Sequence, residues 1–270
     1  LSYLGRSEGP TTVTVVLNDA EMADEQAEVA GVYERRAEQL SIDVAIERGL
    51  GREALADVFE RPTDFVHYIG HCDEEGLRCP DGHLSATHLD ESRVQTFFLN
   101  ACGSYREGIG LIRKGSAAGA VTLHDVLDEQ ATLVGTAFAR LLIHGFGIGQ
   151  ALGIARRRAV LNKGYVVVGD GTHVLSQGDD TYPVILSTDP RPDGDFRLAV
   201  EVFSARDIGG VYQPYLAESD QKHLWGNETA FVLPRDRLAG FLRDANAPVI
   251  HDGTFYWSDE LASELSERAG

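Results

Sequence analysis

The chain has 270 residues, of which 43% are hydrophobic, and 24 Lys and Arg residues face 42 Asp and Glu residues, which gives a formal net charge of −18. This length and apolar content support a hydrophobic core and exclude an intrinsically disordered chain. The negative charge repels phosphate backbones and argues against a nucleic-acid partner. No apolar run approaches the roughly 18–20 residues of a membrane-spanning helix.

Cysteine and lysine are both scarce. Three cysteines are too few for a disulfide scaffold and indicate a reducing compartment, so we expect a cytoplasmic protein. Only three basic residues are lysines, and an acidic surface with so little lysine is typical of proteins from salt-accumulating cytoplasms. An ordinary acidic cytosolic protein is the alternative. Because the chain begins with Leu1 and not Met, we expect that it is excised from a longer chain or processed.

Short β-branched segments alternate with amphipathic segments over the first two thirds of the chain. This alternation predicts βαβ crossovers and a mostly parallel sheet that helices cover on both faces. In chain order we expect strand 12–17, helix 20–39, strand 41–46, helix 52–59, strand 64–69, a loop or hairpin over 72–90, strand 94–99, helix 103–114, strand 118–123, helices 128–145 and 148–161, and strand 165–168.

The amino-acid composition changes near residue 180, where aromatic and β-branched segments lie between clusters of Pro, Gly and Asp. We therefore expect two domains, an α/β domain over 1–178 and a smaller β-rich appendage over 179–270. The elements expected in the appendage are strands 182–187, 196–204, 229–233 and 254–257, and short helices near 236–244 and 258–268.

Two residues with side chains suited to catalysis, a histidine and a cysteine, each follow a predicted buried strand. His71 comes after strand 64–69 and Cys102 after strand 94–99. In open parallel sheets ligands bind beyond the carboxyl ends of the strands, so neighbouring strands would bring both side chains to one edge. There the imidazole would stabilise a nucleophilic thiolate. The backbone N–H groups of Cys72 and Cys102 would bind the oxyanion. Gly103 would permit a sharp turn after the cysteine and a close approach of the substrate backbone.

Two longer motifs carry a family resemblance. Phe65-Val-His-Tyr-Ile-Gly-His71 and Phe97-Phe-Leu-Asn-Ala-Cys102-Gly-Ser104 resemble the strand ends of the CHAT peptidases in the caspase-like (clan CD) cysteine protease superfamily. Segments 119–128, 138–152 and 165–170 follow in the family's order, and the resemblance covers roughly residues 10–175. It implies a caspase-like three-layer sandwich, with His71 as general base and Cys102 as nucleophile. One departure is Cys72, which stands where the family usually has Gly.

The resemblance also implies an activity and its partners. We expect a cysteine endopeptidase that cleaves protein substrates without a cofactor, controlled by modules upstream of Leu1 or acting in trans. In the superfamily, the pocket for the side chain before the cleaved bond takes residues after the fifth strand and after the base. Here these segments supply Asp73, Asp125 and Asp128, which favour an arginine or lysine side chain. These acids are otherwise part of a solvated acidic surface.

Two further functions stay open from the sequence. One is a catalytically weak relative that acts as an interaction or signalling module. The other is a zinc-stabilised binding domain, because His and Cys residues, all plausible zinc ligands, crowd into 22 positions. The six residues between the two cysteines exceed the two to four that are usual in zinc sites. The candidate ligands are His67, His71, Cys72, Cys79, His83 and His88.

Overall fold

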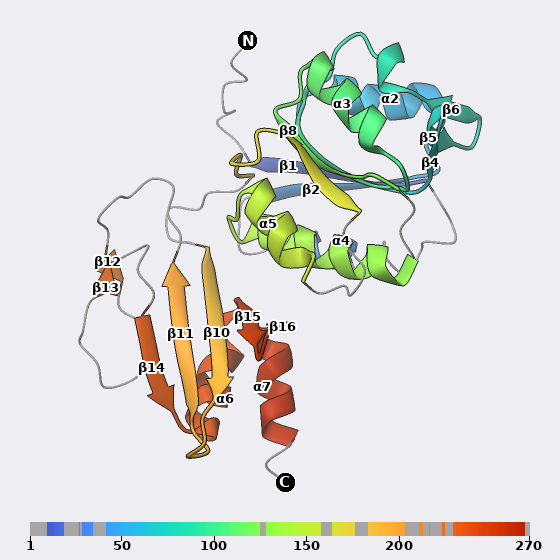
Figure 1. Cartoon of the computed structure of the whole chain (residues 1–270). Coiled ribbons are helices and arrows are strands. Elements are labelled where there is room, and N and C mark those ends of the chain that lie inside the picture. The colour runs from blue at the N-terminus through green and yellow to red at the C-terminus, as the bar shows by residue number, and fades with distance from the viewer. Residues whose placement is uncertain are drawn as a thin grey trace. The chain divides into compact units, whose positions relative to one another are not determined.

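We describe a computed structural model of the chain, which forms two compact units, Leu1–Gly178 and Asp179–Gly270 (Figure 1). The structure describes residues 10–18, 27, 29–34, 42–124, 128–157, 164–175, 183–202, 211–212, 216, 223–224 and 229–267. Much of the helix expected over 20–39 and the end of the helix expected over 148–161 lie outside these residues, although residues 29–34 are helical.

A six-stranded sheet forms the centre of the first unit. Five neighbouring strands run parallel, and the last strand is antiparallel at the edge. The prediction of a mostly parallel sheet is therefore confirmed. In spatial order the strands are β2 (Ile42–Arg48), β1 (Thr11–Leu17), β3 (Thr63–Ile69), β7 (Val94–Asn100), β8 (Ala118–Thr122) and β9 (Tyr165–Gly169).

Helices cover both faces of this sheet, as the sequence pattern predicts (Figure 1). On one side lie α2 (Arg52–Glu60) and α3 (Tyr105–Lys114), and on the other lie α4 (Asp128–Ile143) and α5 (Ile148–Ala155). The unit is a three-layer α/β/α domain. Its strands β3 and β7 lie inside the sheet with a parallel neighbour on each side, so their carboxyl ends open at one edge.

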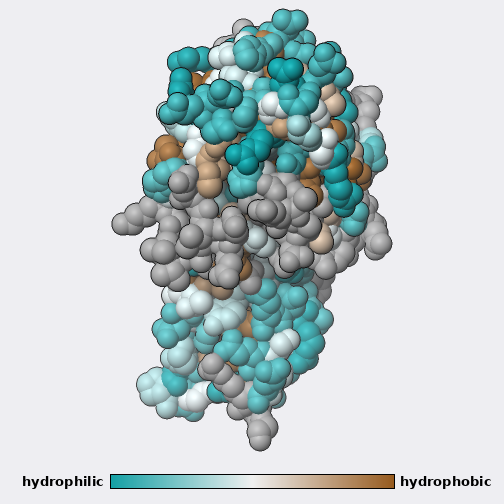
Figure 2. Space-filling view, turned by 90° about the vertical axis from the view of Figure 1, so that its right-hand side faces the viewer, coloured by the Kyte–Doolittle hydropathy of each residue, from teal (hydrophilic) through white to brown (hydrophobic). Residues whose placement is uncertain are grey.

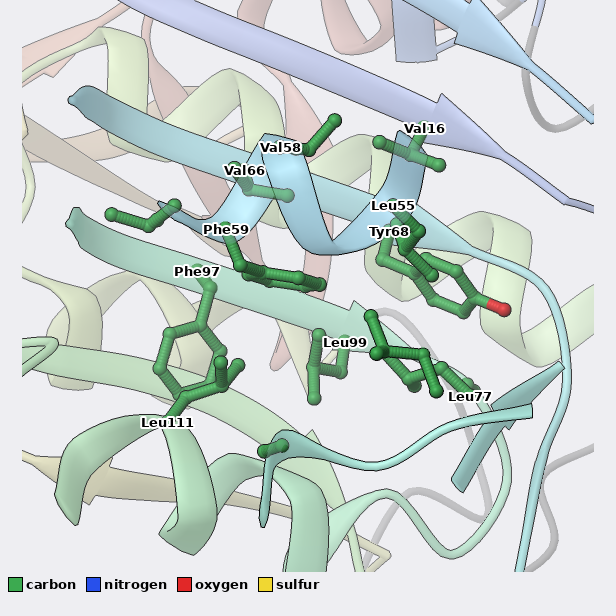
Figure 3. Close-up of a cluster of buried hydrophobic side chains, with 14 of the residues drawn as sticks. Val16, Leu55, Val58, Phe59, Val66, Tyr68, Leu77, Phe97, Leu99 and Leu111 are labelled. Atoms are coloured by element: carbon green, nitrogen blue, oxygen red, sulfur yellow. The ribbon is translucent and has the colours of Figure 1, made fainter. Parts of the chain in front are cut away.

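Alternating side chains of the central strands build the core on the α2 and α3 side (Figure 3). Val66 and Tyr68 of β3 and Phe97 and Leu99 of β7 are fully buried there. Burying an aliphatic or aromatic side chain of this size stabilises the folded state by about 1.5–3 kcal/mol. The intervening residues face the opposite side, where the Phe98 ring lies 4.7 Å from the ring of Phe138 in α4.

The segment that follows His71 is a small antiparallel sheet, in agreement with the hairpin expected over 72–90. It consists of β4 (Cys72–Asp73), β5 (Gly76–Cys79) and β6 (Gly82–Leu84), and a short 3₁₀ helix, η1 (Ala86–His88), comes next. Leu77 and Leu84 are buried in the same core as β3 and β7. The hairpin is thus anchored to the main domain directly beyond the end of β3.

The second unit has its own five-stranded sheet and its own core. Its helices α6 (Arg235–Ala245) and α7 (Ser258–Glu267) pack against each other and against that core. The sequence pattern missed β12 (Val211–Tyr212), β13 (His223–Leu224) and β15 (Pro248–His251), which are too short to show alternation. The main sheet has the order β14 (Thr229–Leu233), β11 (Phe196–Val202), β10 (Val184–Pro190), β15 and β16 (Thr254–Trp257).

On the face shown in Figure 2, the coloured residues are mainly hydrophilic, and hydrophobic residues are scattered among them. Within the described ranges no helix is long and apolar enough to cross a membrane. The large hydrophobic side chains that are exposed there are Tyr105, Leu123, Leu133, Val211 and Val232.

His67 is a core residue on β3. Its side chain is fully buried, its Nδ1 lies 3.3 Å from the hydroxyl oxygen of Tyr33, and its ring packs 4.9 Å from the ring of Phe98. Burial lowers the pKa of His67 to about 3, because the charged form loses its hydration. The imidazole is therefore neutral at physiological pH and serves the packing of the sheet against its neighbours.

We expect His67 to make the folded state sensitive to acid. In the unfolded chain its pKa is about 6.5, so below that pH the unfolded state binds a proton that the folded state rejects until about pH 3. The free energy of unfolding should then fall by about 2 kcal/mol between pH 7 and pH 5 through this group. Urea unfolding of His67→Gln should lack this component, whereas the exposed His88→Gln should keep it. Equal pH dependence in the wild type and His67→Gln would contradict the assignment.

Candidate active site

The pairing of β3 with β7 determines where His71 and Cys102 lie. The two strands are parallel and in register, with Ile69 opposite Asn100 as the last pair. The N–H of Gly70 then donates to the Asn100 carbonyl (3.4 Å). His71 and Cys102 each follow the last pair by two positions, so the two residues leave the sheet at the same level of its carboxyl edge. Both residues are partly buried there.

Tyr68 fixes the backbone at His71. Its hydroxyl oxygen lies 2.9 Å from the carbonyl oxygen of Arg78 and 3.2 Å from that of His71. The Arg78 N–H also donates to the His71 carbonyl (2.9 Å). Gly70 permits this arrangement, because a Cβ at that position would lie only 2.9 Å from the Tyr68 hydroxyl. The tyrosine therefore ties the end of β3 to the hairpin beyond it.

Thr122 and Ser104 fix the turn that carries Cys102. The Thr122 hydroxyl donates to the carbonyl of Ala101. The Ser104 hydroxyl donates to the Leu99 carbonyl (3.0 Å) and accepts a bond from the Thr122 N–H (3.1 Å). Gly103 has φ +66°, a left-handed conformation that costs a residue with a side chain about 1–2 kcal/mol. Cys102 is thus held at a sharp turn between β7 and α3.

A buried amide holds the end of β7 against its neighbours. Asn100 is 2% exposed, and its Oδ1 accepts a hydrogen bond from the Tyr165 hydroxyl (2.7 Å). Its Nδ2 donates to the carbonyl of Ala131 in α4 (3.1 Å). Sequence reasoning missed the positioning roles of Asn100, Thr122 and Tyr68. The one available signal was a polar Asn at the end of an otherwise apolar strand.

Cys102 lies three residues before the first residue of α3, which is Tyr105. The N-terminus of a helix carries a partial positive charge, which favours an anion such as a thiolate. The charge of Glu107 in the first turn of α3 opposes this effect, and its carboxylate also has a structural role. It accepts hydrogen bonds from the Ala86 N–H and from the Ser85 hydroxyl (3.3 Å) and so holds η1 against α3.

The surroundings of Cys72 keep its thiol neutral. Burial above all, and then the charges of Glu107, Asp73 and Cys102, raise the pKa of Cys72 to about 12. Its thiol therefore stays protonated at neutral pH and does not compete as a nucleophile. The described non-glycine residues with positive φ are Asn246 and Asp252, so the strain that a Cβ would suffer at positive φ does not arise at Cys72.

The backbone N–H of Cys72 points away from the hairpin. Cys72 is opposite Leu77, and the adjacent pair, His71 with Arg78, carries the Arg78 N–H bond described above. Hydrogen-bonded and non-hydrogen-bonded pairs alternate in antiparallel strands, so Cys72 occupies a non-hydrogen-bonded position. Its N–H is directed toward the outer side of β4, which is the edge strand of the small sheet.

The structure describes only some of the acidic residues that the sequence predicts to bind substrate. Asp73 Oδ2 lies 2.8 Å from His83 Nε2, and Glu75 Oε2 lies 3.0 Å from His83 Nδ1. The hairpin therefore gathers acidic groups around one histidine directly beyond Cys72, while Glu74 is exposed. Asp125 lies outside the described residues, and so does the side chain of Asp128, whose backbone begins α4.

The zinc site considered from the sequence finds no support. No group of three or more His, Cys, Asp or Glu residues in the described part of the chain is arranged to hold a metal ion. His67 is buried in the core, His83 contacts two carboxylates, and Cys79 is buried, with the side-chain nitrogen of Asn18 3.8 Å from its sulfur. These three candidate ligands, His67, His83 and Cys79, have different contacts.

Comparisons with solved structures identify the architecture. The Arg specific cysteine proteinase gingipain R matches with a TM-score of 0.52 and 14% identity over 82% of this chain and 64% of its own. A complex of the pro- and mature domains of this proteinase from Porphyromonas gingivalis matches with a TM-score of 0.51 and 13% identity over 83% of this chain and 65% of that chain. The fold is that of caspase-like cysteine proteinases.

A weaker match is the Saccharomyces cerevisiae separase–securin complex, with a TM-score of 0.46 and 13% identity over 59% of this chain and 12% of that chain. This chain therefore spans less than two thirds of the length of the structures it resembles. No family model matches the sequence, and no curated protein is similar to it. The narrower resemblance to CHAT peptidases stays a prediction.

We expect Thr122→Val to loosen the turn that carries Cys102. The valine keeps the shape but leaves the Ala101 carbonyl without its donor, which should lower the free energy of unfolding by about 1–3 kcal/mol. It should also change the rate at which iodoacetamide alkylates Cys102. Thr96→Val is the matched control, because buried Thr96 donates to the Asp64 carbonyl (2.8 Å) at the other end of β7. The control should lose stability but keep the alkylation rate. Equal rates of Cys102 alkylation in the wild type, Thr122→Val and Thr96→Val would contradict the role of Thr122 in positioning the turn.

Proposed function

We propose that this protein is a cysteine endopeptidase in which Cys102 is the nucleophile and His71 the general base and later the general acid. The single observation that supports this proposal is the in-register pairing of β3 with β7, because His71 and Cys102 each follow the last pair of these strands by two positions. The caspase-like fold supports it, since the site lies where ligands bind in open parallel sheets.

The proposed reaction has two stages. Cys102 attacks the scissile carbonyl as a thiolate after giving its proton to His71, and the imidazolium then protonates the leaving amine. His71 next takes a proton from a water molecule that attacks the thioester, which releases the acid product and restores the thiol. The N-terminus of α3 would stabilise the thiolate, and the backbone N–H groups of Cys72 and Cys102, beside Gly103, would bind the oxyanion.

The setting of this activity is also part of the proposal. We infer a CHAT-type peptidase that acts on a protein substrate in the cytoplasm, under the control of a module upstream of Leu1 or of a partner. The chemistry assigned to His71 and Cys102 needs no cofactor. The low lysine content and the −18 net charge suit a salt-adapted cytoplasm.

Substitution of either dyad residue tests the activity. We expect Cys102→Ala to abolish hydrolysis of a peptide-library substrate, and His71→Ala to lower kcat/KM by about 10²–10⁴-fold, because the base and acid are lost. Circular dichroism and urea unfolding should show that both variants remain folded. The exposed His88→Ala is the control and should keep full activity. Normal turnover by folded Cys102→Ala would overturn the peptidase assignment.

We also propose a preference for arginine or lysine before the cleaved bond. The support is the acidic residues next to Cys72, together with Asp125 and Asp128 after β8, since a carboxylate pairs bidentately with a guanidinium. Gingipain R, which shares the fold, is Arg specific.

Substrates that differ only at this position should show at least about tenfold faster cleavage after Arg than after Asp, because one charge-assisted hydrogen bond contributes about 1.5–3 kcal/mol. Asp73→Asn and Asp128→Asn should reduce that ratio, and the exposed Glu53→Gln in α2 should leave it unchanged. Fastest cleavage after Asp or after an apolar residue would show that the acids belong only to the solvated surface.

A further inference from the structure

Asn18, the residue directly after β1, joins four segments of the chain near the proposed site. Its backbone N–H donates to the carbonyl of Ile69, the last residue of β3 (3.0 Å). Its side-chain Nδ2 donates to the carbonyls of Leu50 (3.0 Å) and Arg78 (3.2 Å), and its Oδ1 accepts the Leu50 N–H (2.8 Å). Asn18 therefore connects the ends of β1 and β3 with the loop before α2 and with the hairpin strand β5.

The side-chain amide of Asn18 makes these contacts in one orientation. An amide NH₂ group has two donors, and both face carbonyl oxygens, whereas the amide oxygen faces a backbone N–H. A carboxylate has no donor, so an aspartate at this position would place an oxygen against the carbonyls of Leu50 and Arg78. The contacts therefore select an asparagine over the aspartate of the same shape.

The carbonyl of Arg78 links Asn18 to the chain at His71. The same oxygen lies 2.9 Å from the Tyr68 hydroxyl, which also lies 3.2 Å from the His71 carbonyl. A carbonyl oxygen accepts two hydrogen bonds, but the tyrosine has one proton for the two carbonyls. Since Asn18 supplies a donor to Arg78, the Tyr68 proton can bond to the His71 carbonyl.

We propose that Asn18 is a positioning residue that fixes the backbone of His71 by holding the Arg78 carbonyl. The Arg78 N–H donates to the His71 carbonyl (2.9 Å), so Arg78 is held through both its N–H and its carbonyl. Without Asn18, the Tyr68 proton would stay with the nearer Arg78 carbonyl, and the His71 carbonyl would lose one of its two donors. The role of His71 as base rests on the proposed function, whereas the position of its backbone follows from the hydrogen bonds alone.

His71 depends on such ties because β3 ends at Ile69. The N–H of Gly70 makes a last, long bond to β7 (3.4 Å), and the carbonyl of His71 is bonded to the hairpin instead. A shift of this backbone moves the imidazole with it, and misplacing a catalytic group by about 1 Å can cost about 10²-fold in rate. An amide that never touches the substrate can thus influence turnover.

Thr12 offers a matched control at the opposite end of β1. Its hydroxyl donates to the Asp64 carboxylate (2.9 Å), which links the beginnings of β1 and β3 as Asn18 links their ends. Thr12 and Asn18 are both half-buried. Thr12→Val should therefore lower the urea midpoint, as substitutions of Asn18 do, but leave the chain at His71 in place.

The test records the ring signals of His71 in proton–carbon NMR spectra at neutral pH, assigned by their loss in His71→Ala. We expect Asn18→Ala and Asn18→Asp, shown to be folded by circular dichroism, to displace these signals, and Thr12→Val to leave them at their wild-type positions. In peptide hydrolysis, both Asn18 variants should lower kcat by at least about tenfold and change KM by less than about twofold, because the base moves while the substrate contacts remain.

A second comparison isolates the route through Tyr68. Tyr68→Phe lacks the proton that Asn18 directs to His71, so in that background Asn18→Ala should displace the His71 signals less than it does in the wild type. An equal displacement with and without the Tyr68 hydroxyl would show that the proton is not redirected, and would overturn the proposed route.

Unmoved His71 signals in folded Asn18→Ala, or an equal displacement in Thr12→Val, would overturn the positioning role itself. Neither result affects the peptidase assignment, which is tested by Cys102→Ala. Conversely, if the ring signals move as expected in a chain that cleaves no peptide, the positioning role stands and the peptidase assignment alone fails.

Discussion

The in-register parallel pairing of β3 with β7 is the constraint on which the rest of the site depends. Two strands far apart in sequence run side by side in the middle of the sheet, and Ile69 and Asn100 end them at the same level. A slip of one residue would turn each strand's core residues to the opposite face, so the buried rows of both strands hold the register firmly. The hydrophobic packing of β3 and β7 therefore fixes the points at which the chain leaves the sheet toward His71 and Cys102.

Polar contacts convert this register into a defined site. Tyr68 holds the chain beyond β3, Thr122 and Ser104 hold the turn beyond β7, and Asn100 ties the end of β7 to Ala131 of α4. Tyr68, Thr122 and Ser104 donate to backbone carbonyls at or just beyond the end of a strand, where the sheet's own hydrogen bonds stop, whereas Asn100 donates to a carbonyl of helix α4.

The sequence predicted the strands of the central sheet and the helices on both faces, because β-branched runs and amphipathic periods report burial directly. It also placed His71 and Cys102 after two buried strands, and the structure pairs these strands as neighbours. It did not reveal the tie from Thr122 to Ala101 or the surroundings of Cys72, because contacts between residues distant in sequence leave no local pattern. The antiparallel direction of β9 was missed for the same reason.

The rate at which Cys102 is alkylated by iodoacetamide at neutral pH, compared between the wild type and His71→Ala, tests the central claim most directly. Burial raises the pKa of both Cys72 and Cys79, so alkylation of the folded chain reports Cys102. If the register places the imidazole against the thiol, His71→Ala should slow alkylation by at least about tenfold, since the thiolate loses its partner. His88→Ala should match the wild type. Equal rates in the wild type and a folded His71→Ala would contradict the account.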